Sequence, residues 1–114
     1  MLTLDALRAF GADVDEGMNR CMNNEQFYIR LIGMALEDPG FGKLETALAA
    51  GDVQAAFEAA HALKGVLGNL SLTPLYAPTS ELTELLRAGT AVGYEPYLQE
   101  ILSQREKLRA ISKD

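Results

Sequence analysis

The sequence has little of what several classes of protein require. It holds a single cysteine, which excludes an internal disulfide framework and fits a reducing compartment. It contains no apolar run long enough to cross a bilayer, and its first residues lack the basic start and apolar run of a signal peptide. Its 10 basic residues are scattered among 16 acidic ones, which is not the footprint of a nucleic-acid-binding protein. We therefore expect a cytoplasmic protein that binds neither a membrane nor nucleic acid.

Motifs of enzyme chemistry are equally scarce. The sequence has no glycine-rich phosphate loop, no cluster of metal ligands and no nucleophile–base pair. A metabolic enzyme is therefore the least favoured class of function. We expect no cofactor and no metal ion to be bound by this chain.

Alanine and leucine are abundant, whereas β-branched residues are few and no segment alternates as a strand does. With 114 residues, 48% of them apolar, the chain suits one domain spanning residues 1–114. We predict an all-α fold, an up-and-down four-helix bundle with one or two short accessory helices. The predicted helices are a short one between Thr3 and Gly11, one over 25–37, a short one over 41–48, one over 53–70, one from Pro74 and a last one from Pro96.

Prolines and capping residues set several of the expected helix boundaries. Asn23 and Asn24 fit an N-cap before the helix that follows them. Thr73 is expected to cap a later helix, with Pro74 at its first position. Pro78 lies inside the same apolar pattern, so it predicts a kink or a late restart of that helix.

The helix expected after the capping residue Asp52 contains the only histidine, His61. At about 100° per residue, His61 projects roughly 140° away from the centre of the apolar stripe, so we expect it to face solvent. The stripe consists of apolar residues at steps of three and four: Val53, Ala56, Ala60, Leu63, Leu67 and Leu70.

Two glycines, Gly65 and Gly68, lie on the side of this helix that carries His61. Each costs about 1 kcal/mol relative to alanine inside a helix, so folding alone would favour alanine there. The missing side chains let another backbone or a ligand approach closely, which suggests a face cleared for access to the imidazole. The alternative is an ordinary solvated histidine, with Gly68 marking the fraying end of the helix.

The residues from His61 to Gly65 (His-Ala-Leu-Lys-Gly), followed by Asn69-Leu70 and Leu75, resemble the signature of the histidine-containing phosphotransfer (HPt) domain. The segment from Met18 to Leu31 is also similar to the early part of that family. One position departs from the pattern. The family usually has glycine after the Asn-Leu pair, and this chain has Ser71, which affects the turn between two helices more than the chemistry.

The resemblance implies a role in a phosphorelay. His61 would accept a phosphoryl group from the phospho-aspartate of one response-regulator receiver domain and pass it to the aspartate of another. Imidazole suits this task because it is partly neutral near pH 7 and nucleophilic at nitrogen. The implied partners are receiver domains and a hybrid sensor kinase, and the magnesium ion would belong to the receiver. We expect a phosphoryl carrier rather than an enzyme, acting as a monomer.

The neighbours of His61 on the same helix have expected roles in the transfer. Lys64, one turn on, would offset charge on the phosphoryl oxygens, while Gly65 and Gly68 would leave room for the receiver. The alternative for Lys64 is a solvated side chain whose stem covers the helix flank.

Three further residues are candidates for contact with the partner. Phe57 lies about 40° round the helix from His61 and is either part of a docking patch or the flank of the core. Gln54 and Glu58 are candidates for the rim of the same surface.

Two other classes of protein compete with this interpretation. A sensor-kinase dimerisation domain also carries a helical histidine, but that family has an acidic residue and a proline-containing box after it, where this chain has Ala62. A non-catalytic helical adaptor that binds a receiver domain without phosphotransfer is the main alternative. The two glycines and Lys64 argue against the adaptor, because a pure binding surface does not need them.

Overall fold

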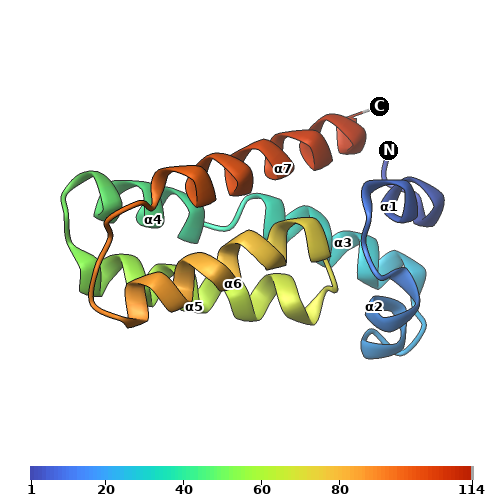
Figure 1. Ribbon diagram of the computed structural model, residues 1–114. Helices are drawn as coiled ribbons and strands as arrows, with labels where there is room; N and C mark the ends of the chain where they lie inside the picture. The colour runs from blue at the N-terminus through green and yellow to red at the C-terminus, as the bar shows by residue number, and fades with distance from the viewer. Residues whose placement is uncertain (114) are drawn as a thin grey trace.

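The computed structural model describes residues 1–113, which form seven helices and no strand (Figure 1). The all-α prediction is confirmed. The helices are α1 (Leu4–Phe10), α2 (Val14–Arg20), α3 (Glu25–Leu36), α4 (Gly40–Ala49), α5 (Val53–Asn69), α6 (Thr73–Arg87) and α7 (Glu95–Lys113). Among the described residues, none of these helices combines the length and the apolar character needed to cross a membrane.

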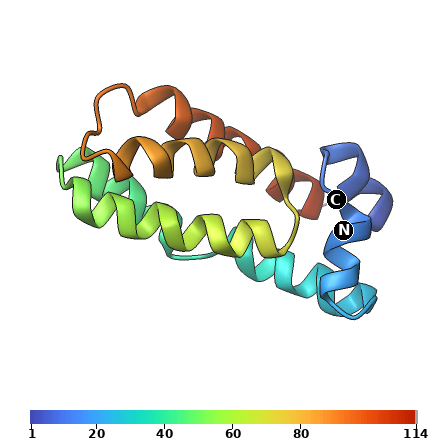
Figure 2. The same cartoon turned by 60° about the horizontal axis from the view of Figure 1, so that its bottom comes forward.

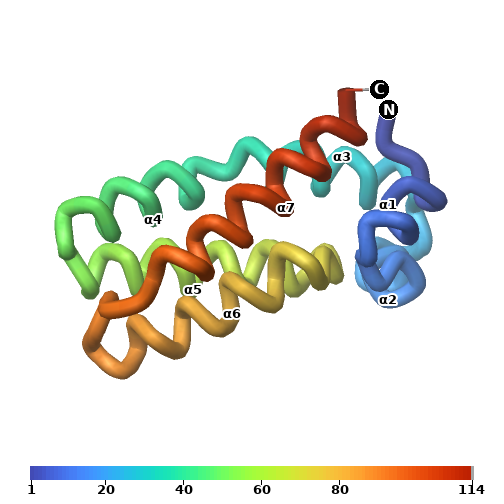
Figure 3. Tube along the Cα trace, turned by 45° about the horizontal axis from the view of Figure 1, so that its top comes forward, coloured from blue at the N-terminus to red at the C-terminus, as the bar shows by residue number. Residues whose placement is uncertain are grey.

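The later helices carry most of the packing. Helix α5 packs against both α4 and α6, and α6 packs in turn against α7. Figure 2 shows α5 and α6 side by side along their length, with α1 and α2 grouped at one end of the molecule. Helices α3 and α4 lie nearly end to end, as Figure 3 shows, and α3 also contacts α7.

The core contains the apolar stripe predicted for α5. Ala56, Ala60, Leu63 and Leu67 are buried, as is Leu70 just after the helix. Asp52 caps this helix through its side chain, which accepts a hydrogen bond from the backbone N–H of Ala55 at 3.1 Å. The predicted orientation of α5 is therefore confirmed, and it leaves His61 exposed on the opposite face.

The start of α6 differs from the prediction. Thr73 is the first residue of the helix rather than its cap, and Leu72 occupies the cap position without a side-chain hydrogen bond. The reason is that Leu72 is fully buried and its carbonyl already accepts hydrogen bonds from the N–H groups of Leu75 and Tyr76. Pro74 is consequently at the second helical position, where its missing N–H is not needed.

Proline also fails to interrupt the later helices. Helix α6 runs unbroken through Pro78, so the predicted late restart is wrong. Pro78 lies close to the start of α6 and removes only the bond that its N–H would have donated to the carbonyl of Pro74. Helix α7 begins at Glu95, so Pro96, which was predicted to open this helix, is its second residue.

The small N-terminal helices are joined to the rest of the fold through Tyr28. This α3 side chain is fully buried, and its hydroxyl donates a hydrogen bond to the carbonyl of Leu70 at 2.7 Å. Its ring lies against Gly17 of α2. Burial raises the pKa of Tyr28 from 10.0 to about 12, so the folded state favours the neutral phenol. The unfolded chain releases this phenol proton more readily than the folded protein does. The free energy of unfolding is therefore expected to fall as the pH rises from 10 to about 12.

Ser71 ends α5 in a conformation that favours glycine. Its φ of +55° is left-handed, and its N–H and that of Leu72 bond back to the carbonyls of Gly68 and Leu67, which is the Schellman arrangement. The side chain is buried, and its Oγ has no hydrogen-bond partner within residues 1–113.

Replacing Ser71 with glycine is therefore expected to stabilise the protein, by about 1 kcal/mol in the free energy of unfolding. Glycine removes both the left-handed backbone cost and the unpaired hydroxyl, and urea unfolding measures the gain. Ser71→Ala is the matched control, because it removes only the hydroxyl and should gain less. A lower urea midpoint for Ser71→Gly would contradict this account of the turn.

Candidate functional site

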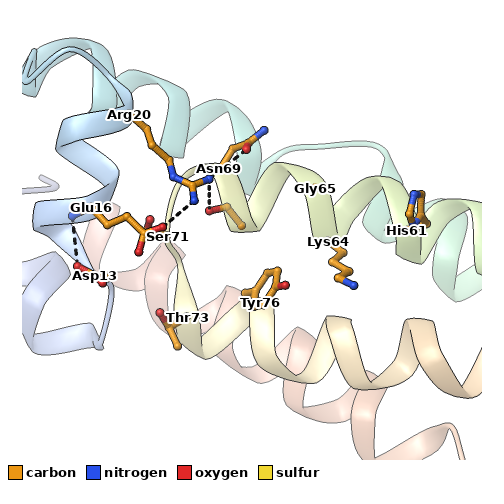
Figure 4. A pocket seen from close by; sticks show the side chains of 11 residues that line it. Asp13, Glu16, Arg20, His61, Lys64, Gly65, Asn69, Ser71, Thr73 and Tyr76 are labelled. Carbon is orange, nitrogen blue, oxygen red and sulfur yellow. Dashed lines mark hydrogen bonds and ion pairs between the residues drawn. The ribbon is translucent and has the colours of Figure 1, made fainter.

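His61 and Lys64 border one hollow on the surface of the protein. His61 is exposed, and Lys64, one turn further along α5, is half-buried. The hollow has a volume of about 550 Å³ and is bounded by α2, α5 and α6 (Figure 4). Its lining also includes Asp13, Glu16, Arg20, Gly65, Gly68, Asn69, Ser71, Thr73 and Tyr76. The four residues predicted to serve the transfer, His61, Lys64, Gly65 and Gly68, thus all border the same hollow.

An aromatic contact holds the other side of His61. The rings of Phe57 and His61 are stacked, with 5.7 Å between centroids and an angle of 20° between planes. The guanidinium carbon of Arg87, on α6, lies 5.0 Å from the centre of the Phe57 ring, a cation–π geometry. Phe57 is half-buried and packs against the core, so it is the flank of the core and the neighbour of His61 at once.

The charges around His61 come from two helices. Glu84 and Arg87 of α6 form an ion pair at 3.0 Å. The hydrogen bond from Arg87 lowers the pKa of Glu84, and the positive charges of Arg87 and Lys64 lower it further. Glu84 therefore stays ionised near the two cations. The chain as a whole carries a net charge of −6, so these two cations are a local exception to its acidity.

The two glycines have different surroundings. A Cβ added to Gly65 would meet nothing within 4 Å, so this part of the face is open to an approaching molecule. A Cβ added to Gly68 would lie 3.0 Å from Cε1 of Tyr76, tighter than ordinary van der Waals contact. The structure thus gives Gly68 a packing reason of its own, because its missing side chain is where the Tyr76 ring rests.

The two predicted rim residues bind each other. The side-chain amide of Gln54 donates a hydrogen bond to Oε1 of Glu58 at 3.1 Å, and both residues are exposed. They lie on the N-terminal side of His61 and do not border the hollow. Their contact with a partner stays a prediction.

Sequence analysis missed the far wall of the hollow. Arg20 of α2 donates hydrogen bonds to Oδ1 of Asn69 at 3.3 Å and to the carbonyl of Gly68 at 3.5 Å, and it is paired with Glu16 at 2.7 Å. It thereby ties α2 to the C-terminal end of α5. No local pattern could reveal this contact, since the partners are 48 and 49 residues apart in sequence. In residues 1–113 no group of three or more His, Cys, Asp or Glu side chains is placed to hold a metal ion.

An all-helical domain with an exposed helical histidine, beside lysine and an uncovered glycine, has the features of a phosphoryl carrier. Residues 38–111 match the model of the Hpt domain family, and this match spans more than half of the chain. The protein therefore belongs to the Hpt domain family, whose members carry phosphoryl groups on histidine in phosphorelays and work with response-regulator receiver domains. No match was found among curated proteins or among solved structures.

The match covers α4, α5, α6 and most of α7, including the motif that begins at His61. Helices α1, α2 and α3 precede it, so the similarity suggested for residues 18–31 stays a prediction. One wall of the hollow is accordingly made by residues that lie outside the family match.

Proposed function

We propose that this chain accepts a phosphoryl group on His61 from the phospho-aspartate of a receiver domain and passes it to the aspartate of another receiver. The observation that carries the proposal is the position of His61. It is exposed on α5, with Lys64 one turn away and the open backbone of Gly65 beside it. A hybrid sensor kinase would supply the first phosphorylated receiver.

The transfer step places specific demands on these residues. A neutral ring nitrogen of His61 attacks phosphorus, the bond from phosphorus to the aspartate oxygen breaks, and the carboxylate leaves with the electron pair. The imidazolium formed then releases its proton to solvent. Negative charge on the phosphoryl oxygens is spread over three atoms in the transition state, and the Lys64 ammonium would offset part of it. The magnesium ion for this chemistry would be held by the receiver.

The fold supports the same proposal. We infer an up-and-down four-helix bundle, supported by the nearly end-to-end arrangement of α3 and α4, by the packing of α5 against α4 and α6, and by that of α6 against α7. In this arrangement α1 and α2 are the two accessory helices at one end. Such a bundle would hold the exposed His61 on an outer face, where a second folded domain would have access to it.

Transfer of label from a phosphorylated receiver tests the proposal. The chain is mixed with a panel of ³²P-labelled receiver domains and magnesium, and the product is treated with acid and with alkali. A phosphorus–nitrogen bond predicts label that is lost in acid and kept in alkali. Binding of a receiver without any transfer of label would overturn the proposal in favour of the adaptor.

Gly65→Ala is expected to separate stability from function. Alanine inside a helix raises the free energy of unfolding by about 1 kcal/mol, and the added Cβ meets no other atom of the protein. The same methyl group occupies space that the receiver would use, so transfer is expected to slow by about tenfold or more. Urea unfolding and single-turnover transfer measure the two effects.

The matched control for this variant is Gly33→Ala. Gly33 lies inside α3, its added Cβ would also meet nothing within 4 Å, and it does not border the hollow. We expect the same gain in stability with no change in transfer. Equal transfer rates for the two variants would show that the face of Gly65 is not used by the partner.

A further inference from the structure

Tyr76 is positioned on the hollow by Gly68. It lies in the first turns of α6, and its ring is half-buried against α5. A Cβ on Gly68 would be 3.0 Å from Cε1 and 3.2 Å from Cδ1 of this ring. With alanine at this position the ring would have to shift by a few tenths of an ångström. The contact therefore fixes where Tyr76 stands relative to Lys64 and His61 on α5.

The hydroxyl of Tyr76 is not used by the fold. Tyr28, the comparable tyrosine, is fully buried and donates its hydroxyl hydrogen to the carbonyl of Leu70. Tyr76 makes no such hydrogen bond within residues 1–113, and its hydroxyl is not among the buried unpaired atoms. It borders the same hollow as His61 and Lys64, and Figure 4 shows its hydroxyl on the side of the ring that faces Lys64.

A receiver that reaches His61 must also cover this hollow. A specific interface between two proteins buries about 800 Å² on each partner, which extends well beyond one imidazole. Lys64 and Tyr76 both border this hollow, and each side chain can donate a hydrogen bond. The complementary group on the partner is an acceptor, either a carboxylate or a backbone carbonyl.

We propose that Tyr76 is a docking residue, whose hydroxyl donates a hydrogen bond to an acceptor on the receiver domain that exchanges the phosphoryl group with His61. The inference rests on the proposed function and adds a partner contact to it. It also gives Gly68 a purpose in recognition, because this glycine allows the ring to take its place.

Tyr76→Phe tests the proposal with little risk to the fold, because the ring stays on Gly68 and only the hydroxyl is lost. The dissociation constant of the receiver complex, and the KM for receiver in single-turnover transfer, are expected to rise roughly three- to tenfold. The transfer rate at saturating receiver is expected to stay unchanged. Tyr97→Phe is the control, since Tyr97 is also half-buried but lies on α7 and does not border the hollow.

A second variant checks the role of Gly68. Gly68→Ala pushes the ring from its place, so it should raise the KM in the natural chain. Tyr76→Phe and Gly68→Ala should then be non-additive, because both act on the same contact. Additive effects of the two substitutions would contradict the proposal.

The outcomes distinguish this inference from the proposed function. Equal affinity of the natural chain and Tyr76→Phe for the receiver overturns the docking role, and so does a loss confined to the rate at saturation. If the chain binds a receiver but takes no label, the proposed function fails, and the dissociation constants still decide the role of Tyr76. If no receiver binds at all, both fail.

Discussion

Replacing His61 with glutamine is expected to abolish acceptance of the phosphoryl group, with a loss of rate on the order of 10³-fold or more. The amide of glutamine is a poor nucleophile, although it is polar and close to histidine in size. The fold should be unaffected, because His61 is exposed and its contact with Phe57 is made at the surface. Single-turnover transfer measures the loss, and circular dichroism with urea unfolding checks the fold.

Substitution of Lys64 is expected to slow transfer less than substitution of His61 does. Lys64→Ala is expected to slow transfer by about tenfold without abolishing it, because the ammonium offsets charge but forms no bond to phosphorus. Affinity of His61→Gln for the receiver should stay near that of the natural chain. Undiminished labelling of His61→Gln would place the acceptor elsewhere and refute the central assignment.

The part of this site that lies on a single helix could be predicted from sequence. The 3.6-residue period fixes the direction of every side chain on α5, so the burial of Leu63 and Leu67 and the exposure of His61 follow from spacing alone. Two of the helix caps were also predictable, because a capping side chain bonds to a backbone N–H only two or three positions on. The Asp52 cap joins residues three positions apart, and the Asn24 cap does so as well.

Contacts between helices could not be predicted in this way. Periodicity says which face of α5 carries Phe57, but not that Arg87 of α6 stands over its ring. It also gave Gly65 and Gly68 one shared role, whereas only Gly68 lies beneath Tyr76. These contacts depend on the offset of α6 along α5, which the periodicity of a single helix does not encode. The start of α6 was misplaced by one residue at the turn between α5 and α6, where a buried leucine outweighed the capping preference of Thr73.

The hollow is lined partly by residues inside the family match and partly by residues that precede it. His61 and Lys64 lie within the family match, whereas Arg20 and Glu16 on the opposite wall precede it. The proposed transfer chemistry needs only His61 and Lys64. The position of the wall depends on the packing of α2 against α3, so a substitution there is expected to act on stability and docking rather than on the chemical step.

Gly17→Ala is the substitution with the largest expected effect on stability. A Cβ at this position would lie 2.6 Å from Cζ and 2.7 Å from Cε1 of Tyr28, a ring that is fully buried and bonded to the carbonyl of Leu70. Neither the ring nor α2 can move without losing packing or this hydrogen bond. We expect a loss of about 3 kcal/mol in the free energy of unfolding, measured by urea denaturation.

A loss of stability in Gly17→Ala would identify the steric clash with Tyr28 as its cause, because helix propensity alone predicts a gain. Alanine is the better helix former by about 1 kcal/mol, and Gly33→Ala, where the added Cβ is free, should therefore be stabilising. Combining Gly17→Ala with Tyr28→Phe should recover part of the loss, because the hydroxyl is the atom nearest to the new methyl group. The double variant should still transfer at the natural rate when the receiver is saturating, since His61 and Lys64 are untouched. An unchanged urea midpoint for Gly17→Ala would mean that α2 does not pack on Tyr28 in solution, and the hollow would then lack its far wall.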